Sequence, residues 1–406
     1  MKIVKGSLTA PKGFLANGIK AGIKKSGRKD LAIICSEVPA IAAAAFTKNK
    51  FQAAPVRVSK LHLKNKTHQA IIVNSGNANC ANGKIGDRDA LLMTEFTAEA
   101  LSVNENEILI ASTGVIGKYL PIQKISGKIP ELIDGLSEHG GEFFAEAIMT
   151  TDTRKKEAAV RFKLDGIPVT IAGACKGVGM ICPDMKVERH ATLLCFLTTD
   201  AAISKKMLEE ALYEAIGGSL NMISVDGDMS TNDSCFILAN GLAGNKRIGS
   251  RGTDYGAFLE ALELLTENLA KMLVADGEGA TKFVEIEVTG AKNTEDAKKI
   301  ARKISNSNLL KCCIFGNDPN WGRVIAACGA SDADFNPDKV DVYLGKVKVF
   351  SDGARIKKYD EKSVKKLFAG KDIYIKIDLK GGRNKATAWT CDLSKEYVAI
   401  NSEYST

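Results

Sequence analysis

Two short polar segments that directly follow apolar runs hold residues suited to acyl chemistry. Residues 74–79 read Asn-Ser-Gly-Asn-Ala-Asn, and residues 111–117 read Ala-Ser-Thr-Gly-Val-Ile-Gly. In the second segment Gly114 allows the backbone to approach another group closely. A backbone N–H and the Thr113 hydroxyl can then stabilise an oxyanion. Both patterns also occur in ordinary Asn/Gly turns, so neither identifies a function alone.

Further polar segments supply hydroxyl, ammonium and carboxylate groups. Residues 149–153 (Met-Thr-Thr-Asp-Thr) can hold an amino acid or cap a turn. Residues 176–180 begin with a lysine but lack the G-x-x-x-x-G-K-[ST] order, which excludes a nucleotide loop of that kind. Residues 224–233 are acidic but lack the EF-hand order, which argues against calcium. Glu278 stands between two glycines after a predicted helix, where a carboxylate can bind an ammonium group, although glycine there is normally a helix cap.

The overall composition excludes several classes of protein. Of the 406 residues, 45% are hydrophobic and 26% are charged, as in ordinary globular proteins. The net charge of +8 comes from 56 basic and 48 acidic residues, without the concentrated basic face of a nucleic-acid binder. No apolar run approaches the ~20 residues that span a bilayer. We therefore expect neither a nucleic-acid partner nor a membrane segment.

Cysteine and histidine usage predicts the compartment and argues against a metal. The ten cysteines are scattered without a C-x-x-C, and most lie in apolar runs, as buried free thiols do. With no signal peptide at the start, this predicts a reducing, cytoplasmic location. None of the four histidines has metal-ligand spacing, so we expect no metal site.

Helices and strands that alternate along the chain must position these segments. Apolar spacing predicts helices over 87–102, 205–216, 255–275 and, after a Thr294 cap, up to 305. Short apolar or alternating runs predict strands over 169–172, 193–198, 283–288, 347–350 and 373–378. Period-two patterns late in the chain suggest an antiparallel sheet. The fold class expected is α+β, with sheets covered by helices.

The order of the polar segments resembles the ornithine acetyltransferase family, also called bifunctional glutamate N-acetyltransferase, which acts in arginine biosynthesis. The match runs from Lys5 to Thr406, essentially the whole chain. Its most specific pieces are residues 74–79, 112–117, 149–153, 176–180, 191–194 with 198–201, 276–282 and 320–323. The resemblance implies a self-cleaving, N-terminal-nucleophile-like fold of the aminopeptidase/ornithine acetyltransferase type, with sheets sandwiched by helices.

The resemblance also implies a processed enzyme. The precursor would cut itself between Ala191 and Thr192, giving an alpha chain of residues 1–191 and a beta chain of residues 192–406 in an α2β2 heterotetramer. Thr192 would take acetyl from N-acetylornithine and pass it to glutamate. Bifunctional members use acetyl-CoA as a second donor, and no cofactor is implied.

Family positions carry over residue by residue. Thr113 and Gly114 match the oxyanion-hole pair, and Thr192 matches the nucleophile. The substrate-binding positions match Thr150, Lys176, Thr192, Glu278, Asn401 and Thr406. Thr151 is the alternative to Thr150 if that assignment slips by one residue.

An N-terminal threonine makes chemical sense in this chain. A free α-amino group titrates near ~7.7–8.0, so the amine of Thr192 can serve as the base for its own hydroxyl. No histidine is then needed. Lys176 and Glu278 suit the carboxylate and ammonium of an α-amino acid. Periodicity alone would leave Thr192 as a residue at the start of a strand.

One departure from the family lies just before the expected cut. Relatives run Pro-x-Met or Pro-x-Leu directly into Ala-Thr, whereas here residues 186–190 intervene between Met185 and Ala191. Such an insertion can loop out, or it can relax the strain that drives cleavage. Two alternative hypotheses stay open. One is a related self-cleaving aminopeptidase, and the other is an unprocessed binding protein on the same scaffold, with the insertion as the cause of the lost processing.

Overall fold

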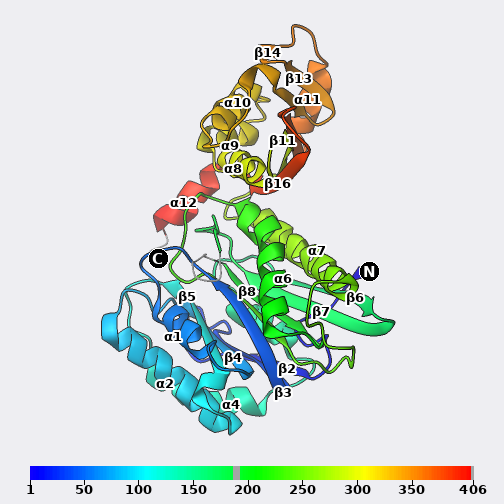
Figure 1. The fold of residues 1–406 in the computed structure, drawn as a ribbon. Coiled ribbons are helices and arrows are strands. Elements are labelled where there is room, and N and C mark those ends of the chain that lie inside the picture. The colour runs from blue at the N-terminus through cyan, green and yellow to red at the C-terminus, as the bar shows by residue number, and fades with distance from the viewer. Residues whose placement is uncertain (186–192, 404–406) are drawn as a thin grey trace.

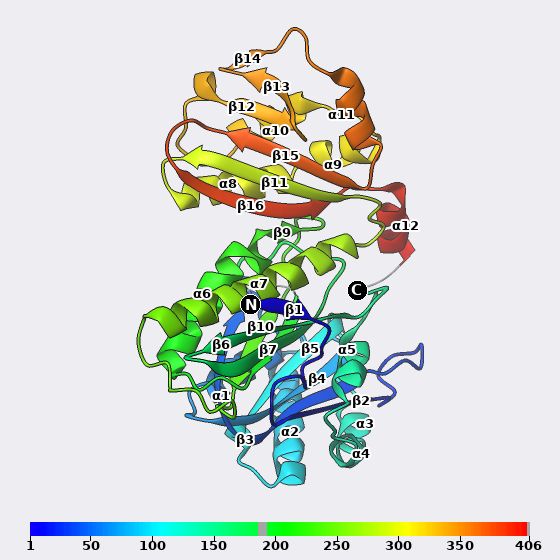
Figure 2. The same cartoon turned by 90° about the vertical axis from the view of Figure 1, so that its right-hand side faces the viewer.

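The computed structural model describes residues 1–185 and 193–403 and has two stacked lobes, each built on one sheet (Figures 1 and 2). Helices cover the sheets, so the α+β class predicted from the sequence is confirmed. Among the described residues, no helix is long and apolar enough to cross a membrane.

The larger lobe is built on a nine-stranded sheet with the order β1-β6-β7-β8-β10-β3-β4-β5, and β2 pairs with β3. Strands β3 and β4 are almost continuously apolar because both faces of the sheet are covered. The strands are β1 Lys2–Val4, β2 Phe14–Ile19, β3 Leu31–Phe46, β4 His68–Asn77, β5 Ile108–Val115, β6 Lys156–Leu164, β7 Ile167–Lys176, β8 Leu194–Thr199 and β10 Ser234–Ala239.

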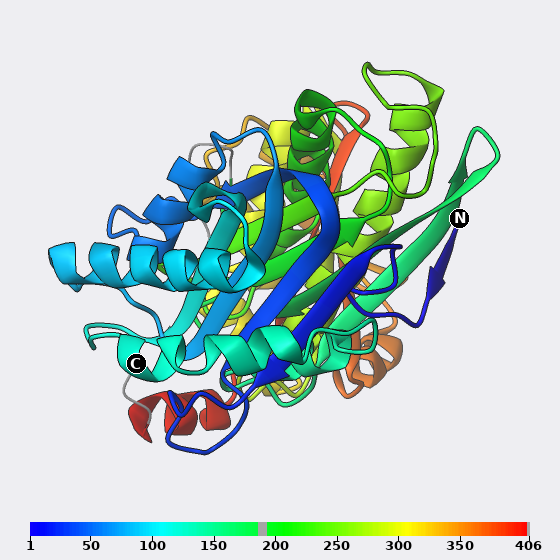
Figure 3. The ribbon, with the colours of Figure 1, turned by 90° about the horizontal axis from the view of Figure 1, so that it is seen from below.

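Helices pack on this sheet through apolar faces. Seen from below, α2 and α5 lie across the strands (Figure 3). The long helix α7 packs on β6 and β7 and buries Phe258, Leu262, Leu265 and Leu269, the stripe expected from the sequence. The helices of this lobe are α1 Ala54–His62, α2 Gly83–Leu101, α3 Ile122–Ser126, α4 Ile129–Asp134, α5 Gly141–Ile148, α6 Lys205–Gly218 and α7 Thr253–Ala275.

The smaller lobe is built on a seven-stranded sheet with the order β14-β13-β12-β15-β11-β16-β9. The expectation of an antiparallel sheet is only partly right, because β11 runs parallel to β15 and β16 runs parallel to β9. Its strands are β9 Ile223–Ser224, β11 Phe283–Ala291, β12 Asp341–Leu344, β13 Val347–Ser351, β14 Ala354–Arg355, β15 Asp372–Asp378 and β16 Asn384–Cys391. Its helices are α8 Thr294–Ser305, α9 Asn308–Phe315, α10 Trp321–Gly329 and α11 Glu361–Phe368, and α12 Lys395–Glu403 lies where the lobes meet (Figure 2).

Local capping explains where two helices start. Ser204 caps α6, since its side chain accepts from the Met207 N–H. The predicted Thr294 cap of α8 is wrong by one residue. Asn293 has the extended backbone of a cap, and its side chain accepts from the Asp296 N–H at 2.8 Å.

The strand register brings distant polar segments to one edge of the large sheet. β4 and β5 run parallel, and Ser75 and Gly76 face Thr113 and Gly114. Lys176 at the end of β7 faces Leu194 at the start of β8, and Leu194 in turn faces Ser234 of β10. The loops that carry function therefore meet where these strands begin or end.

Candidate functional site

A small cavity at this edge collects the predicted site residues that the structure describes. Its volume is about 140 Å³. Thr192, Ala191 and Thr406 lie outside the described residues. The predicted residues lining the cavity are Thr113, Gly114, Thr150, Thr151, Lys176, Glu278 and Asn401.

The candidate oxyanion pair is formed where β5 leaves the sheet. Gly114 has a φ of 131°, and a Cβ there would lie 2.5 Å from the Asn77 backbone nitrogen, so only glycine fits. The Lys176 ammonium donates to the Thr113 hydroxyl at 3.3 Å. This contact places a positive charge beside the pair.

Lys176 is held by a buried charge network that the sequence did not reveal. Asp152 accepts from the Thr150 N–H at 2.9 Å and from the Gly177 N–H at 2.8 Å, so one carboxylate fixes both loops. Lys156 bridges Asp152 and Asp276 at 2.6 Å each. The two aspartates are 124 positions apart in the chain, so no local pattern could show that they share a lysine.

Burial and neighbouring charges shift the pKa values of Asp152 and Lys176. Burial raises the pKa of Asp152, but Lys176 and Lys156 outweigh it and bring the pKa to about 2. Burial lowers the pKa of Lys176, and Asp152 partly offsets that effect. The ionised Asp152 carboxylate therefore opposes the effect of burial and favours the cationic form of Lys176.

Glu278 faces the cavity from the turn after α7. It accepts from the Thr151 hydroxyl at 2.8 Å and from the Asn401 amide at 3.0 Å. A Cβ at Gly179 would lie 2.8 Å from Glu278 Oε1, so the carboxylate fills the space that a side chain would need. Of the two threonines left open by the sequence, both line the cavity and Thr151 is the one that contacts Glu278.

Two residues of segment 224–233 form hydrogen bonds that link the segments lining the cavity. Asp226 accepts from the Met180 and Ile181 N–H groups at 2.6 and 2.9 Å, and from the Tyr397 hydroxyl of α12 at 3.3 Å. The Asn232 amide donates to the carbonyls of Ala78 and Ser112 at 2.6 and 2.8 Å. The sequence showed only an acidic, turn-like segment here, and its amide and carboxylates were the available signal.

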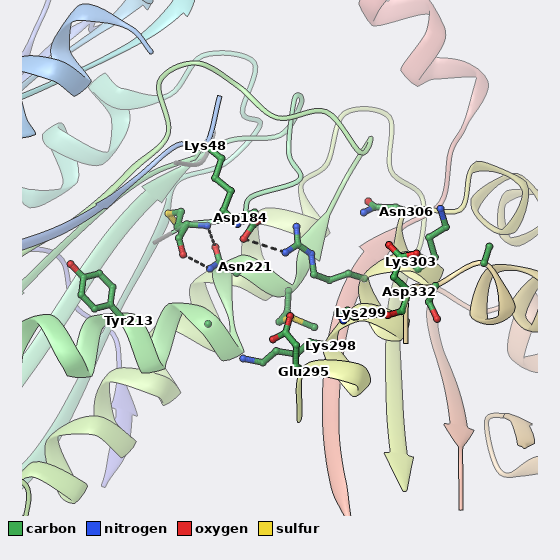
Figure 4. A pocket seen from close by; sticks show the side chains of 16 residues that line it. Lys48, Asp184, Tyr213, Asn221, Glu295, Lys298, Lys299, Lys303, Asn306 and Asp332 are labelled. Carbon is green, nitrogen blue, oxygen red and sulfur yellow. Dashed lines mark hydrogen bonds and ion pairs between the residues drawn. The ribbon is translucent and has the colours of Figure 1, made fainter. Parts of the chain in front are cut away.

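A larger hollow of about 1160 Å³ lies between the lobes (Figure 4). It is lined by charges of both signs, including Lys298 and Lys303 of α8. Asp184 forms ion pairs with both Arg302 and Lys48, so these charges of the lining are already paired with one another. None of the predicted site residues among those described lines this hollow, so volume does not decide the site. The described residues also hold no cluster of three or more His, Cys, Asp or Glu side chains suited to a metal.

The protein has an α+β fold covered by helices, and its small cavity holds a buried ammonium group and a carboxylate. Such an arrangement is typical of an enzyme that binds a charged small molecule. The chain belongs to the ArgJ family, whose model matches residues 15–406. The family predicted from the order of the polar segments is thereby confirmed.

Two sequence relatives match essentially the whole chain, and a solved structure matches about half of it. The chain is 51% identical over 404 residues to the "Arginine biosynthesis bifunctional protein ArgJ" of Dehalococcoides mccartyi, covering 99% of this chain and 98% of that protein. It is 45% identical over 417 residues to the "Glutamate N-acetyltransferase" of Methanocaldococcus jannaschii, covering 100% of each. A solved structure of ornithine acetyltransferase complexed with ornithine from Mycobacterium tuberculosis is 36% identical, covering 46% of this chain and 99% of that chain, with a TM-score of 0.43.

Proposed function

We propose that this protein is a glutamate N-acetyltransferase of arginine biosynthesis, which moves acetyl from N-acetylornithine to glutamate through an acetyl ester on Thr192. The observation that carries the proposal is the cavity itself. It brings Thr113 and Gly114 of β5 together with Lys176 of β7, Asn401 of α12 and Glu278. The names of the two sequence relatives support the same activity.

The reaction proceeds in two acyl transfers. The Thr192 hydroxyl attacks the acetyl carbon of N-acetylornithine, and its proton passes to the α-amine of the same residue. The oxyanion that forms is stabilised by Gly114 and Thr113, and one such donor is worth roughly 10²–10³ in rate. The intermediate collapses, and the ornithine amine leaves with the proton. The amine of glutamate then attacks the ester and releases N-acetylglutamate and the free Thr192 hydroxyl.

Charged walls orient the substrates. Lys176 binds the carboxylate of the amino acid, because it is buried beside the oxyanion pair and already donates to Thr113. Glu278, held by Thr151 and Asn401, binds the ammonium group of the ornithine moiety. A cavity with one buried cation and one fixed carboxylate favours a small zwitterion over a peptide.

Processing would create this enzyme from one precursor, cut between Ala191 and Thr192. Chains 1–191 and 192–406 would stay together because they share a sheet. β8 pairs with β7, and β10 pairs with β3, so the two adjacent strands of the second product lie between strands of the first in one sheet. Assembly into an α2β2 heterotetramer, a cytoplasmic location and acetyl-CoA as a second donor belong to the same proposal.

The decisive experiment measures acetyl transfer to glutamate from N-acetylornithine and from acetyl-CoA in parallel. Transfer from N-acetylornithine is expected. Release of amino acids from peptides without acetylation of glutamate would identify an aminopeptidase. An intact single chain without transfer would identify an unprocessed binding protein.

A further inference from the structure

The side-chain amide of Asn232 joins the two strand ends that carry the oxyanion pair. Its two N–H groups donate to the carbonyls of Ala78 and Ser112 at 2.6 and 2.8 Å, and its oxygen accepts from the Thr231 hydroxyl at 2.7 Å. The residue is 6% exposed. Both hydrogens of the amide are therefore used, and the contact with Thr231 fixes which way round the amide lies.

The Ser112 carbonyl lies on the free edge of the large sheet. β5 ends the strand order, and β4 is its one strand neighbour among the described residues. Alternate residues of a strand direct their backbone groups to the same edge. Ile110 marks the free edge, because its N–H and its carbonyl both bond to the Ser59 hydroxyl, at 2.8 and 2.7 Å. Ser112 and Gly114 follow at intervals of two, so the Gly114 N–H points to the edge where Asn232 is bound.

The backbone around Gly114 is closely packed, so a small displacement would disturb it. A Cβ on Gly114 would lie 2.5 Å from the Asn77 backbone nitrogen, which shows how near β5 comes to β4. On one side of Gly114, the Ala78 N–H donates to the Val115 carbonyl at 3.0 Å. Asn232 supplies the contact on the other side, and Gly114 is held between the two.

This contact also crosses the expected cut. Ala78 and Ser112 belong to residues 1–191, whereas Asn232 precedes β10 in residues 192–406. The geometry of the oxyanion pair in the first product therefore depends on a side chain of the second.

We propose that Asn232 is a positioning residue, which holds Gly114 and Thr113 so that their donors point at the acetyl oxygen. This inference rests on the proposed function. Asn232 acts through the pair, because donors that are already oriented need not rearrange as negative charge develops on that oxygen. A group in this role changes kcat and leaves binding of the unreacted substrate nearly unaffected.

The test is Asn232→Leu, which keeps a side chain branched at the same carbon and removes both donors. The kcat for transfer from N-acetylornithine to glutamate, measured per folded and cut enzyme, should fall roughly 10–10²-fold, since a misplacement of about 1 Å costs up to 10²-fold. The KM should stay nearly unchanged, because Lys176 and Glu278 keep their contacts.

Asn245→Leu is a matched control. Asn245 is also 6% exposed, and its amide also donates to two backbone carbonyls, those of Ala202 and Lys246, at 3.2 and 2.8 Å. It follows β10, whereas Asn232 precedes it, and it does not line the cavity. N245L should lower the urea midpoint of unfolding, as N232L does, and keep the wild-type kcat per folded enzyme.

A double-mutant cycle separates positioning from a general loss of structure. If Asn232 acts through Gly114, N232L should lower kcat far less in the Gly114→Ala background than in the wild type, because the pair is already displaced there. Independent roles would give losses that multiply.

Four outcomes would overturn the inference: wild-type kcat in folded N232L, an equal loss in N245L, losses that multiply in the cycle, or a raised KM at constant kcat. If N232L does not fold or is not cut, Asn232→Asp decides. Its carboxyl donates one hydrogen bond when protonated and none when ionised, so its kcat relative to the wild type should rise as pH falls. A ratio that does not change with pH contradicts the role. Failure of the proposed function is distinguishable, since the wild-type protein itself would then not acetylate glutamate.

Discussion

Replacing Lys156 with methionine should destabilise the protein strongly, although the residue lies outside the cavity lining. Its side chain is 1% exposed and bridges the carboxylates of Asp152 and Asp276 at 2.6 Å each. Breaking a buried ion pair by removing one partner costs about 3–5 kcal/mol of unfolding free energy. The lower part of that range is expected, because Asp152 keeps the nearby Lys176 and Asp276 keeps its hydrogen bonds from Thr153.

The neighbouring residue provides the control. Lys155 forms an ion pair with Glu142 at 2.6 Å, but those side chains are 38% and 66% exposed. Exposed pairs of this kind contribute about 0–1 kcal/mol. Urea unfolding of K156M and K155M, each against the wild type, measures the difference. Equal losses in the two variants, or an unchanged K156M, would refute the placement of a buried ammonium between two carboxylates.

Three further predictions concern the cavity and its network. Gly114→Ala should lower kcat by about 10²–10³-fold, because the added Cβ would meet the Asn77 backbone nitrogen. Gly117→Ala is the control for positive φ, since nothing lies within 4 Å of a Cβ at that position. An equal loss of kcat in the two variants would contradict the reasoning. Glu278→Gln should raise the KM for N-acetylornithine roughly 10–100-fold through loss of a charge-assisted bond, with a smaller effect on kcat; an unchanged KM would remove Glu278 from substrate binding. The Asp152 carboxyl has a pKa of about 2 against an ordinary 3.8, so its stabilising contribution of roughly 2 kcal/mol is present above about pH 4 and is lost as pH falls toward 2. Urea midpoints of Asp152→Asn should therefore depend less on pH in this acid range than those of the wild type, and parallel curves would contradict the shift.

Periodicity predicted those elements whose environment repeats along the chain. The stripe of α7 and the alternation of β11 and β15 depend on one buried face each, which the sequence displays directly. The parallel pairing of β11 with β15 could not be predicted, because it depends on which strands meet after the intervening helices have packed. The start of α8 was misplaced because Asn293 and Thr294 are both good capping residues, and backbone conformation decides between them.

Some residues of the candidate site could likewise be predicted from the sequence, and others could not. Thr113, Gly114 and Glu278 belong to glycine-rich segments that the sequence displays, and the register of β4 and β5 then places two of these segments side by side. The supporting contacts were missed because they join distant positions. Lys156 with Asp276 and Asn232 with Ser112 are separated by 120 residues each, so only the folded chain reveals them.

The most direct measurement is mass spectrometry of the enzyme after incubation with N-acetylornithine and without glutamate. The beta chain, starting at Thr192, should gain the mass of one acetyl group, the modification should map to Thr192, and addition of glutamate should remove it. Thr192→Ala should remain uncut and unacetylated. A wild-type protein that acetylates glutamate while its beta chain never carries acetyl, or while the chain stays intact, would contradict catalysis through an N-terminal Thr192.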